Sequence, residues 1–266
     1  MTQQQPERIS WQRLVDGDIP PWVMRFIKLT GKAINTYDMI RDGDSVLLSV
    51  SGGKDSLALA LALSIRLKWL PIHYNLSALM INWIEHPISE EAKANLHQYF
   101  KGLGIPLTIC DEKQYPESFK GEFNCYLCSR NRRRVMFNYA QEHDCKLIAM
   151  GHHLDDLVET TLLNLGSRGT FSTMLPIQEF FNGKLHIIRP MIEVHESTTR
   201  RLSEIYDLPT VKPVCPYDQT NIRSRLKPIV KELTHIDRDA REHIYHAHDF
   251  SYRIPRETIK EPDYFR

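Results

Sequence analysis

The sequence predicts an α/β protein with a parallel twisted sheet covered by helices on both faces. Short apolar runs alternate with helical stretches of about 10–15 residues, which indicates βαβ units. The 266 residues are 42% hydrophobic and 25% charged, so the chain can bury a sizeable core, and disorder as its main state is excluded. Strands linked by helices in this way form a sheet whose two faces are both buried.

The predicted elements follow in order along the chain. Residues 1–40 are expected to form a helical extension, because apolar side chains recur there at helical spacing. Residues 41–208 form the predicted α/β domain, with strands at 45–50, 74–81, 105–110, 147–150 and 186–188 and helices at 56–67, 89–103, 129–142, 154–165 and 195–205. Prolines interrupt the pattern from residue 209, and two polar helices are expected near 221–233 and 237–248, so residues 209–266 are predicted to be a helical C-terminal segment.

The composition narrows the class of protein. Lys and Arg number 34 against 33 Asp and Glu, so any contact with nucleic acid must depend on a local patch. The chain has no run of about 18 apolar residues and its first ten residues are polar, so we expect a cytoplasmic protein without a membrane span or secretory signal. Five cysteines without a signal favour reduced thiols, as metal ligands or in catalysis, over a disulfide scaffold.

The loop after the first predicted strand has the character of a phosphate site. It reads SGGKDS at residues 51–56 and lies at the start of a helix, where free N–H groups and the helix dipole favour phosphate. Two glycines allow close backbone approach, Lys54 adds positive charge and Asp55 suits magnesium. The alternative is a Gly-Gly turn with an ordinary Ser or Asp helix cap. The complete segment favours a nucleotide site, for which the candidates here are Ser49, Ser51, Gly52, Gly53, Lys54, Asp55 and Ser56.

SGGKDS resembles the PP-loop of the ATP pyrophosphatase family. The resemblance implies a Rossmann-like fold similar to that of the adenine nucleotide α-hydrolases. It also implies cleavage of ATP to AMP and pyrophosphate and transient adenylation of a substrate oxygen. The family includes GMP synthetase, tRNA lysidine synthetase and several tRNA thiolases, and the PP-loop alone does not choose among them.

A cysteine pair, Cys125-Tyr126-Leu127-Cys128, lies just ahead of a predicted helix. Two thiolates at this spacing can hold one metal or cluster, and Cys215 in a proline-rich loop offers a third. Asp218 or a histidine would complete a zinc site, so zinc and cluster both stay open, as do incidental cysteines and a redox pair. Cys110 and Cys145 border apolar strands and are interpreted as buried or half-buried residues without a role in the site.

With these cysteines, the chain resembles the tRNA 2-thiocytidine synthetases, the iron–sulfur-dependent PP-loop thiolases, over roughly residues 33–233. The shared motifs are SGGKDS, CxxCSRxRR at 125–133, GHHxDD at 151–156, Ile188-Arg189-Pro190 and Cys215 in a Pro-flanked loop. The resemblance implies a [4Fe–4S] cluster held by Cys125, Cys128 and Cys215. Typical members carry a second CxxC whose last position is Asp218 here. This difference leaves open an intact cluster, since the missing cysteine need not be a ligand, an Asp-capped cluster, or a different substrate.

The GHHLDD segment follows the predicted strand at 147–150, at the edge of the sheet where such folds bind ligands. Its histidines and carboxylates also suggest zinc, but adjacent carboxylates diverge on a helix, and a plain helix cap is the other alternative. By resemblance Gly151 and His152 line the nucleotide pocket, and Asp155 and Asp156 lie near the ATP phosphates and Mg²⁺. Asn82, at the end of the second predicted strand, is a weaker candidate for the adenosine side.

Basic residues follow the CxxC pair. Arg130, Arg133 and Arg134 share one helix face and Arg132 points elsewhere, so either a solvated face or a phosphate-binding face is indicated. By resemblance, Arg132 occupies a catalytic position, with Lys54, Asp55, Asp155 and Asp156. The predicted tRNA contacts are Arg130, Arg133, Arg134, Arg200, Arg201, Arg223 and Arg225.

The leading hypothesis is ATP-dependent, iron–sulfur-dependent 2-thiolation of cytidine 32 in the tRNA anticodon loop, with sulfur from a cysteine desulfurase. One alternative is a PP-loop sulfurtransferase acting on another base or a small molecule. A second is a non-catalytic nucleotide sensor that binds a cluster or zinc. The implied cofactors are the cluster and ATP with Mg²⁺, the implied partners are tRNA and the desulfurase, and a homodimer is one expectation for the oligomeric state.

Overall fold

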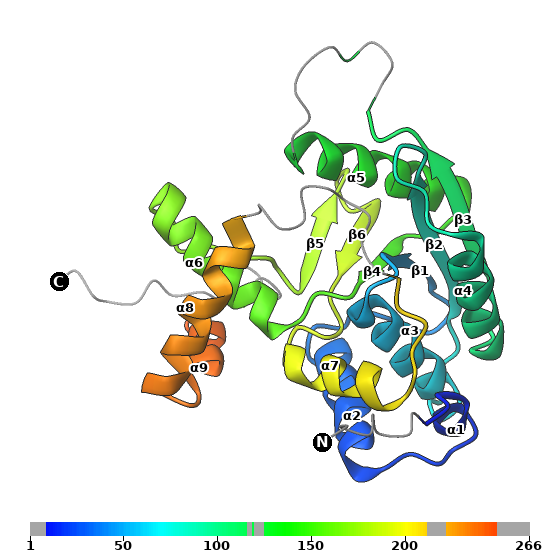
Figure 1. Ribbon diagram of the computed structural model, residues 1–266, viewed down its shortest axis with the longest axis horizontal. Coiled ribbons are helices and arrows are strands. Elements are labelled where there is room, and N and C mark those ends of the chain that lie inside the picture. Colours follow the sequence, from blue (N-terminus) through cyan, green and yellow to red (C-terminus); the bar gives the residue numbers. More distant parts are fainter. Residues whose placement is uncertain (1–8, 116–118, 120–124, 212–221, 249–266) are drawn as a thin grey trace, which may run out of the picture.

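The computed structural model describes residues 9–115, 119, 125–211 and 222–248 (Figure 1). The strands are β1 (Ser45–Val50), β2 (Asn75–Trp83), β3 (Leu107–Glu112), β4 (Leu147–Met150), β5 (Ile177–Phe180) and β6 (Leu185–Ile188). The helices are α1 (Gln12–Val15), α2 (Pro21–Thr36), α3 (Lys54–Leu67), α4 (Glu90–Gly102), α5 (Cys125–Glu142), α6 (Leu154–Arg168), α7 (Glu196–Ile205), α8 (Ile222–Ile236) and α9 (Ala240–His246).

The strands form one sheet in the order β3-β2-β1-β4-β6-β5. All neighbours pair in parallel except β5, which runs antiparallel to β6. The predicted parallel sheet is confirmed, and the strand β5 is an addition to it. Its four residues pair with β6 through a tight hairpin in which Phe181, Asn182 and Gly183 all have positive φ.

Helices cover both faces of the sheet, as predicted. Alternate side chains of β1 enter two different clusters: Leu47 packs with Met136 and Ala140 of α5, whereas Val46 and Leu48 pack with α3. Figure 1 shows α5 above the sheet and α3 and α7 below it. The apolar run SVLLSV is therefore buried on both sides, which explains why it lacks a polar alternation.

The helices outside the α/β core share its apolar cluster. Trp11, before α1, packs edge-on against Tyr99 of α4 at a ring-centroid distance of 4.7 Å. In Figure 1, α6, α8 and α9 gather at one side, and Tyr245 of α9 places its hydroxyl against that of Tyr37. The predicted domain boundaries at residues 40 and 208 stay predictions. Within the described ranges, no helix combines the length and the apolar character that crossing a membrane requires.

Two element boundaries differ from the prediction in a way that affects the site. Helix α3 begins at Lys54, because Gly53 takes an extended conformation and acts as the N-cap. Helix α5 begins at Cys125, so the CxxC pair forms the first turn of the helix instead of preceding it. Sequence spacing placed both starts too late, since neither motif has the apolar periodicity that marks the remainder of its helix.

Candidate active site

The SGGKDS loop joins β1 to α3 at the carboxyl edge of the sheet. Gly52 has a φ of +78°, and a Cβ there would approach the Cβ of Val211 to 3.0 Å, so both the conformation and the space require glycine. Ser56 Oγ donates to the carbonyl of Gly53 at 2.9 Å, and Ser51 Oγ accepts from the N–H of Gly53 at 3.3 Å. Among the described residues no side chain caps α3, which leaves its first-turn N–H groups to a ligand.

The GHHLDD segment packs directly on this loop. A Cβ on Gly151 would lie 2.9 Å from both the carbonyl carbon of Asp55 and the backbone nitrogen of Ser56. Only glycine therefore lets the turn after β4 reach the first turn of α3. The structure thus brings together the two segments that the sequence assigned to one nucleotide site.

Lys54 and Asp55 are held by the first turn of α7. Lys54 Nζ lies 3.0 Å from both Asp55 Oδ2 and Glu196 Oε1, and Thr199 Oγ1 donates to Asp55 Oδ1. Burial lowers the pKa of Lys54, but the two carboxylates outweigh it and raise the pKa above its ordinary value. Lys54 therefore keeps its charge at the mouth of the loop.

Glu196 is the centre of an ion-pair cluster. Besides Lys54, it contacts Arg200 at 3.2 Å and Lys227 of α8 at 3.3 Å. Burial alone would raise the pKa of Glu196. The hydrogen bond from Lys54 and the positive charges of Lys54, Lys227 and His153 outweigh burial and lower that pKa to about 2. Glu196 thus ties the SGGKDS loop to the C-terminal helices.

Asp155 and Asp156 are both engaged by the protein. Asp155 is buried, accepts from the N–H of Glu196 at 2.7 Å and pairs with Arg241 of α9 at 2.6 Å. Asp156 forms a capping box with His153 at the start of α6. The helix-cap alternative therefore describes Asp156, and Asp155 acts across elements by fixing the start of α7.

A cavity of about 720 Å³ opens beside this cluster, between α6, α7, α8 and α9. Glu159, only 4% exposed, lines it. Burial, partly offset by Lys227, raises the pKa of Glu159 to about 6. Sequence reasoning missed Glu159, Glu196, Thr199 and Arg241. The one available signal was position, because Glu196 and Thr199 begin the first helix after the carboxyl end of β6.

The cysteine pair lies at the same edge of the sheet, on the first turn of α5. Cys125 is exposed and Cys128 is half-buried, and Gln114 Nε2 donates to Cys128 Sγ at 3.2 Å. Gln114 closely follows β3, a strand that lies two strand spacings, or about 10 Å, from β1 across the sheet. Cys215 and Asp218 lie outside the described residues. No cluster of three or more potential metal ligands occurs in the part of the chain that the structure describes.

The arginines predicted to contact tRNA or the adenylate are spread over α5, α7 and α8. Arg130, Arg132, Arg133 and Arg134 are all exposed on α5, with the Arg132 guanidinium 5.8 Å from the Trp83 ring centre and Arg134 3.7 Å from Glu112. On α7, Arg200 pairs with Glu196 while Arg201 stacks over Trp22 at 4.5 Å. Arg225 is exposed on α8, and the side chain of Arg223 lies outside the described set.

Two candidates for the ATP pocket make contacts within the sheet region. Asn82 is buried in β2, where its amide donates to Asp111 and its oxygen accepts from the N–H of Ile88 at 3.0 Å. Ser49 Oγ donates to the sulfur of Met136 at 3.0 Å. His152 is half-buried after Gly151. These contacts fix Asn82 and Ser49 without requiring a ligand.

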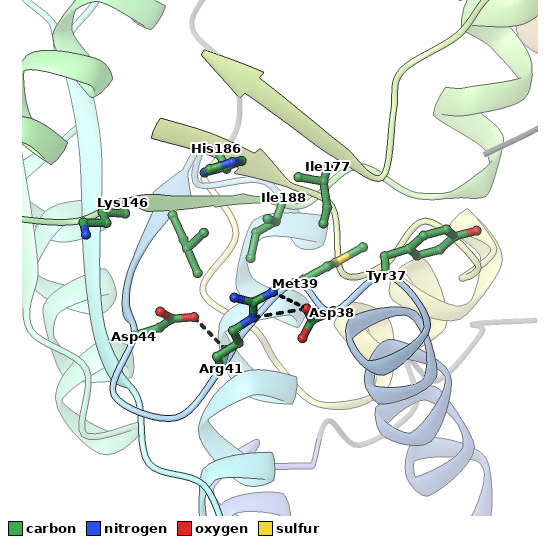
Figure 2. Close-up of a pocket in the computed structure, with 10 residues that line it drawn as sticks. Tyr37, Asp38, Met39, Arg41, Asp44, Lys146, Ile177, His186 and Ile188 are labelled. Carbon is green, nitrogen blue, oxygen red and sulfur yellow. Dashed lines mark hydrogen bonds and ion pairs between the residues drawn. The ribbon is translucent and has the colours of Figure 1, made fainter. Parts of the chain in front are cut away.

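A second cavity, of about 610 Å³, lies at the opposite edge of the sheet (Figure 2). Asp44, Lys146 and Ile177 line it, and Arg41 pairs there with Asp38 at 2.6 Å. In the described ranges, none of the predicted ATP, cluster or tRNA residues lines this cavity. The carboxyl edge therefore remains the candidate site.

The fold and this site define a nucleotide-binding α/β protein with a PP-loop. The family model of the PP-loop domain matches residues 26–228. The tRNA-cytidine(32) 2-sulfurtransferase of Syntrophotalea carbinolica is 36% identical over 209 residues, which cover 77% of this chain and 81% of that protein. The corresponding protein of Alkalilimnicola ehrlichii is 34% identical over 221 residues, covering 80% of this chain and 68% of that protein. The chain belongs to the PP-loop domain family and, within it, to the family of these tRNA-cytidine(32) 2-sulfurtransferases.

A solved structure supports the same fold. The U34-tRNA thiolase NcsA from Methanococcus maripaludis, with its [4Fe–4S] cluster, superposes with a TM-score of 0.67. The match covers 90% of this chain and 81% of that chain at 23% identity. The predicted Rossmann-like class is thereby confirmed.

Proposed function

We propose that this protein thiolates cytidine 32 of tRNA at C2, using ATP to activate the base and an iron–sulfur cluster to deliver sulfur. One juxtaposition carries the proposal: the PP-loop and the CxxC turn of α5 lie at the same carboxyl edge of the sheet. Membership of the 2-sulfurtransferase family supports the choice of base. The other bases and small-molecule acceptors are the alternatives that the experiment below separates.

The residues of the PP-loop suit the first half-reaction. The uncapped N–H groups of α3 and the charged Lys54 bind and orient the phosphates, and they stabilise the charge that develops when the C2 oxygen of cytidine attacks the α-phosphate. The products are an O-adenylated base and pyrophosphate. Asp55, whose side chain is 26% exposed, is the carboxylate best placed to contact Mg²⁺, an ion that is typically bound by one or two carboxylates together with the phosphates.

The cysteine turn suits the second half-reaction. Cys125 and Cys128 are spaced i,i+3 on one helix face, and the thiol of Cys128 receives an amide N–H, a donor set that suits a cluster ligand. With Cys215 they would hold a [4Fe–4S] cluster with one iron free of cysteine, and the bound cluster would supply sulfide at C2 while AMP leaves. Asp218 is the candidate for a fourth ligand. The sulfur is proposed to come from a cysteine desulfurase.

The exposed arginines of α5 are proposed to place the tRNA backbone next to the cluster. Three of these arginines lie within two helical turns of Cys128: Arg130, Arg133 and Arg134. Phosphate contacts there would bring an unstacked tRNA base to the carboxyl edge of the sheet. Arg132 is proposed to neutralise charge on the adenylate. The protein is further proposed to act in the cytoplasm and as a homodimer.

The test uses anaerobically purified full-length protein. Iron, sulfide and zinc are measured first, and then pyrophosphate release with and without tRNA and 2-thiocytidine by nucleoside analysis. We expect about four iron and four sulfide per chain, tRNA-stimulated pyrophosphate release, and thiolation that is lost in Cys128→Ala but kept in the control Cys110→Ala. Full thiolation by Cys128→Ala, or zinc without iron after reconstitution, would contradict the cluster. Thiolation of another base would redirect the substrate assignment.

A further inference from the structure

Gln114 is a buried amide committed to a cysteine. Its side chain is 3% exposed, and Nε2 lies 3.2 Å from Cys128 Sγ. Burying a glutamine is costly unless its polar atoms have partners, so this placement needs a compensating contact. The sulfur of Cys128 is the partner of its N–H.

The backbone of Gln114 is fixed from two directions. Its N–H donates to both carboxylate oxygens of Glu85, at 2.9 and 3.1 Å. Asn131 Nδ2 donates to the carbonyls of Lys113 and Gln114, at 2.8 and 3.1 Å. Asn131 stands one turn after Cys128 on α5, so the same helix that carries the cysteine also holds the strand end that carries the amide. The donor is therefore set in place before any cluster binds.

We infer that Gln114 is a positioning residue for Cys128 as a cluster ligand, and that its N–H raises the reduction potential of the cluster and prolongs its retention. A hydrogen bond to a ligand sulfur withdraws electron density and favours the reduced, more negative state of the cluster. The inference rests on the proposed function, because it takes Cys128 to be a ligand.

The two cysteines of the pair lie in different environments. Cys125 is exposed and Cys128 is half-buried against the strand end. Among the contacts of the described residues, Gln114 donates to Cys128, so the Fe–S bond of Cys128 would be the one that a fixed donor supports.

The test compares Gln114→Met, which removes the donor at similar volume, with Gln114→Glu, which replaces it by an acceptor. Gln141→Met, an exposed position on α5, is the matched control. Each full-length protein is reconstituted anaerobically, and iron content, reduction potential and the rate of bleaching in air are measured. Unfolding in urea of each apoprotein establishes that the variants are folded.

We expect the reduction potential to shift to more negative values in Gln114→Met and further in Gln114→Glu, with bleaching several-fold faster in both and no change in Gln141→Met. A wild-type potential and bleaching rate in Gln114→Met and Gln114→Glu would overturn the inference and leave the proposed function intact. A wild-type chain that assembles no iron–sulfur cluster would overturn both. If Gln114→Met fails to fold, Asn131→Ala, which loosens the same amide, is expected to shift the potential in the same direction, and an unchanged value there would overturn the inference.

Discussion

The α-carbon of Gly151 lies against the backbone of Asp55 so closely that a single methyl group at residue 151 would come within 2.9 Å of the Asp55 carbonyl carbon. The obstacle is backbone, which cannot rotate away. We therefore expect Gly151→Ala to destabilise the protein by about 1–3 kcal/mol and, because the first turn of α3 must move, to weaken ATP binding about tenfold. Thermal unfolding and ATP titration measure the two effects.

Gly166→Ala is the matched control for that substitution. Gly166 lies within α6 and has no positive φ. A Cβ at this position would meet no atom of the residues that the structure describes within 4 Å. Alanine there is expected to stabilise the helix by about 0.5–1 kcal/mol with ATP affinity unchanged. Equal effects of the two substitutions would show that glycine at 151 has no special role.

Glu196→Gln is expected to remove the ion pair between Glu196 and Lys54. At neutral pH the loss of a charged partner costs about 1–3 kcal/mol of stability and lowers turnover, since Lys54 is then held by Asp55 alone. The folded pKa of Glu196, about 2, is below the ordinary value of 4.5, so its contribution is complete above pH 4.5 and is lost as the pH falls toward 2. Urea unfolding at pH 7 and at pH 3.5 should show the gap between variant and wild type narrowing. A gap independent of pH would count against the ion pair.

Glu159→Gln is expected to stabilise the protein at high pH, whereas Glu196→Gln destabilises it. The folded pKa of Glu159 is raised to about 6, so its ionisation costs stability as the pH rises from 4.5 through 6. The amide removes this cost, and the variant should be more stable than the wild type at pH 8 by about 1–2 kcal/mol, with little difference at pH 4. Glu204→Gln, on the exposed side of α7, is the control and should change neither value. Destabilisation of Glu159→Gln at pH 8 would mean that the carboxylate is needed in its charged form.

Arg133→Ala is expected to weaken tRNA binding through the loss of one phosphate contact. The slope of log affinity against log salt should fall in magnitude by about 0.7–0.9. Arg13→Ala is the control: Arg13 lies in α1 and pairs with Asp18, so its substitution should leave the slope unchanged. Filter binding over a series of salt concentrations checks both, and an unaltered slope for Arg133→Ala would favour the solvated-face interpretation of α5.

The sequence was informative wherever a local pattern dictates structure. SVLLSV and LIAM are short apolar runs bounded by turns, and β1 and β4 have the predicted bounds. The contact between SGGKDS and GHHLDD was also predictable, since both follow parallel strands and such ends share one edge. Strand β5 was not, because Ile177–Phe180 is only four residues long and owes its pairing to the hairpin with β6.

The partners of the site residues were beyond local reasoning. Glu196 is an ordinary first-turn glutamate by sequence, and Gln114 has no motif at all. Their roles arise from tertiary contacts with Lys54 and Cys128, which propensity and spacing do not encode. The roles assigned to Asp155 and Asp156 by resemblance stay predictions, because the structure shows both carboxylates bound within the protein.

The separation along the chain between Lys54 and Glu196 has a consequence for biosynthesis. Glu196 is made 142 residues after Lys54, and Tyr245 is made 208 residues after Tyr37. At a ribosomal rate of about 5–20 residues per second, roughly 7–28 s pass between the synthesis of Lys54 and that of Glu196. A nascent chain stalled before α7 would carry the whole SGGKDS motif without the contacts that hold its lysine, so the capacity to bind nucleotide properly is acquired late in translation.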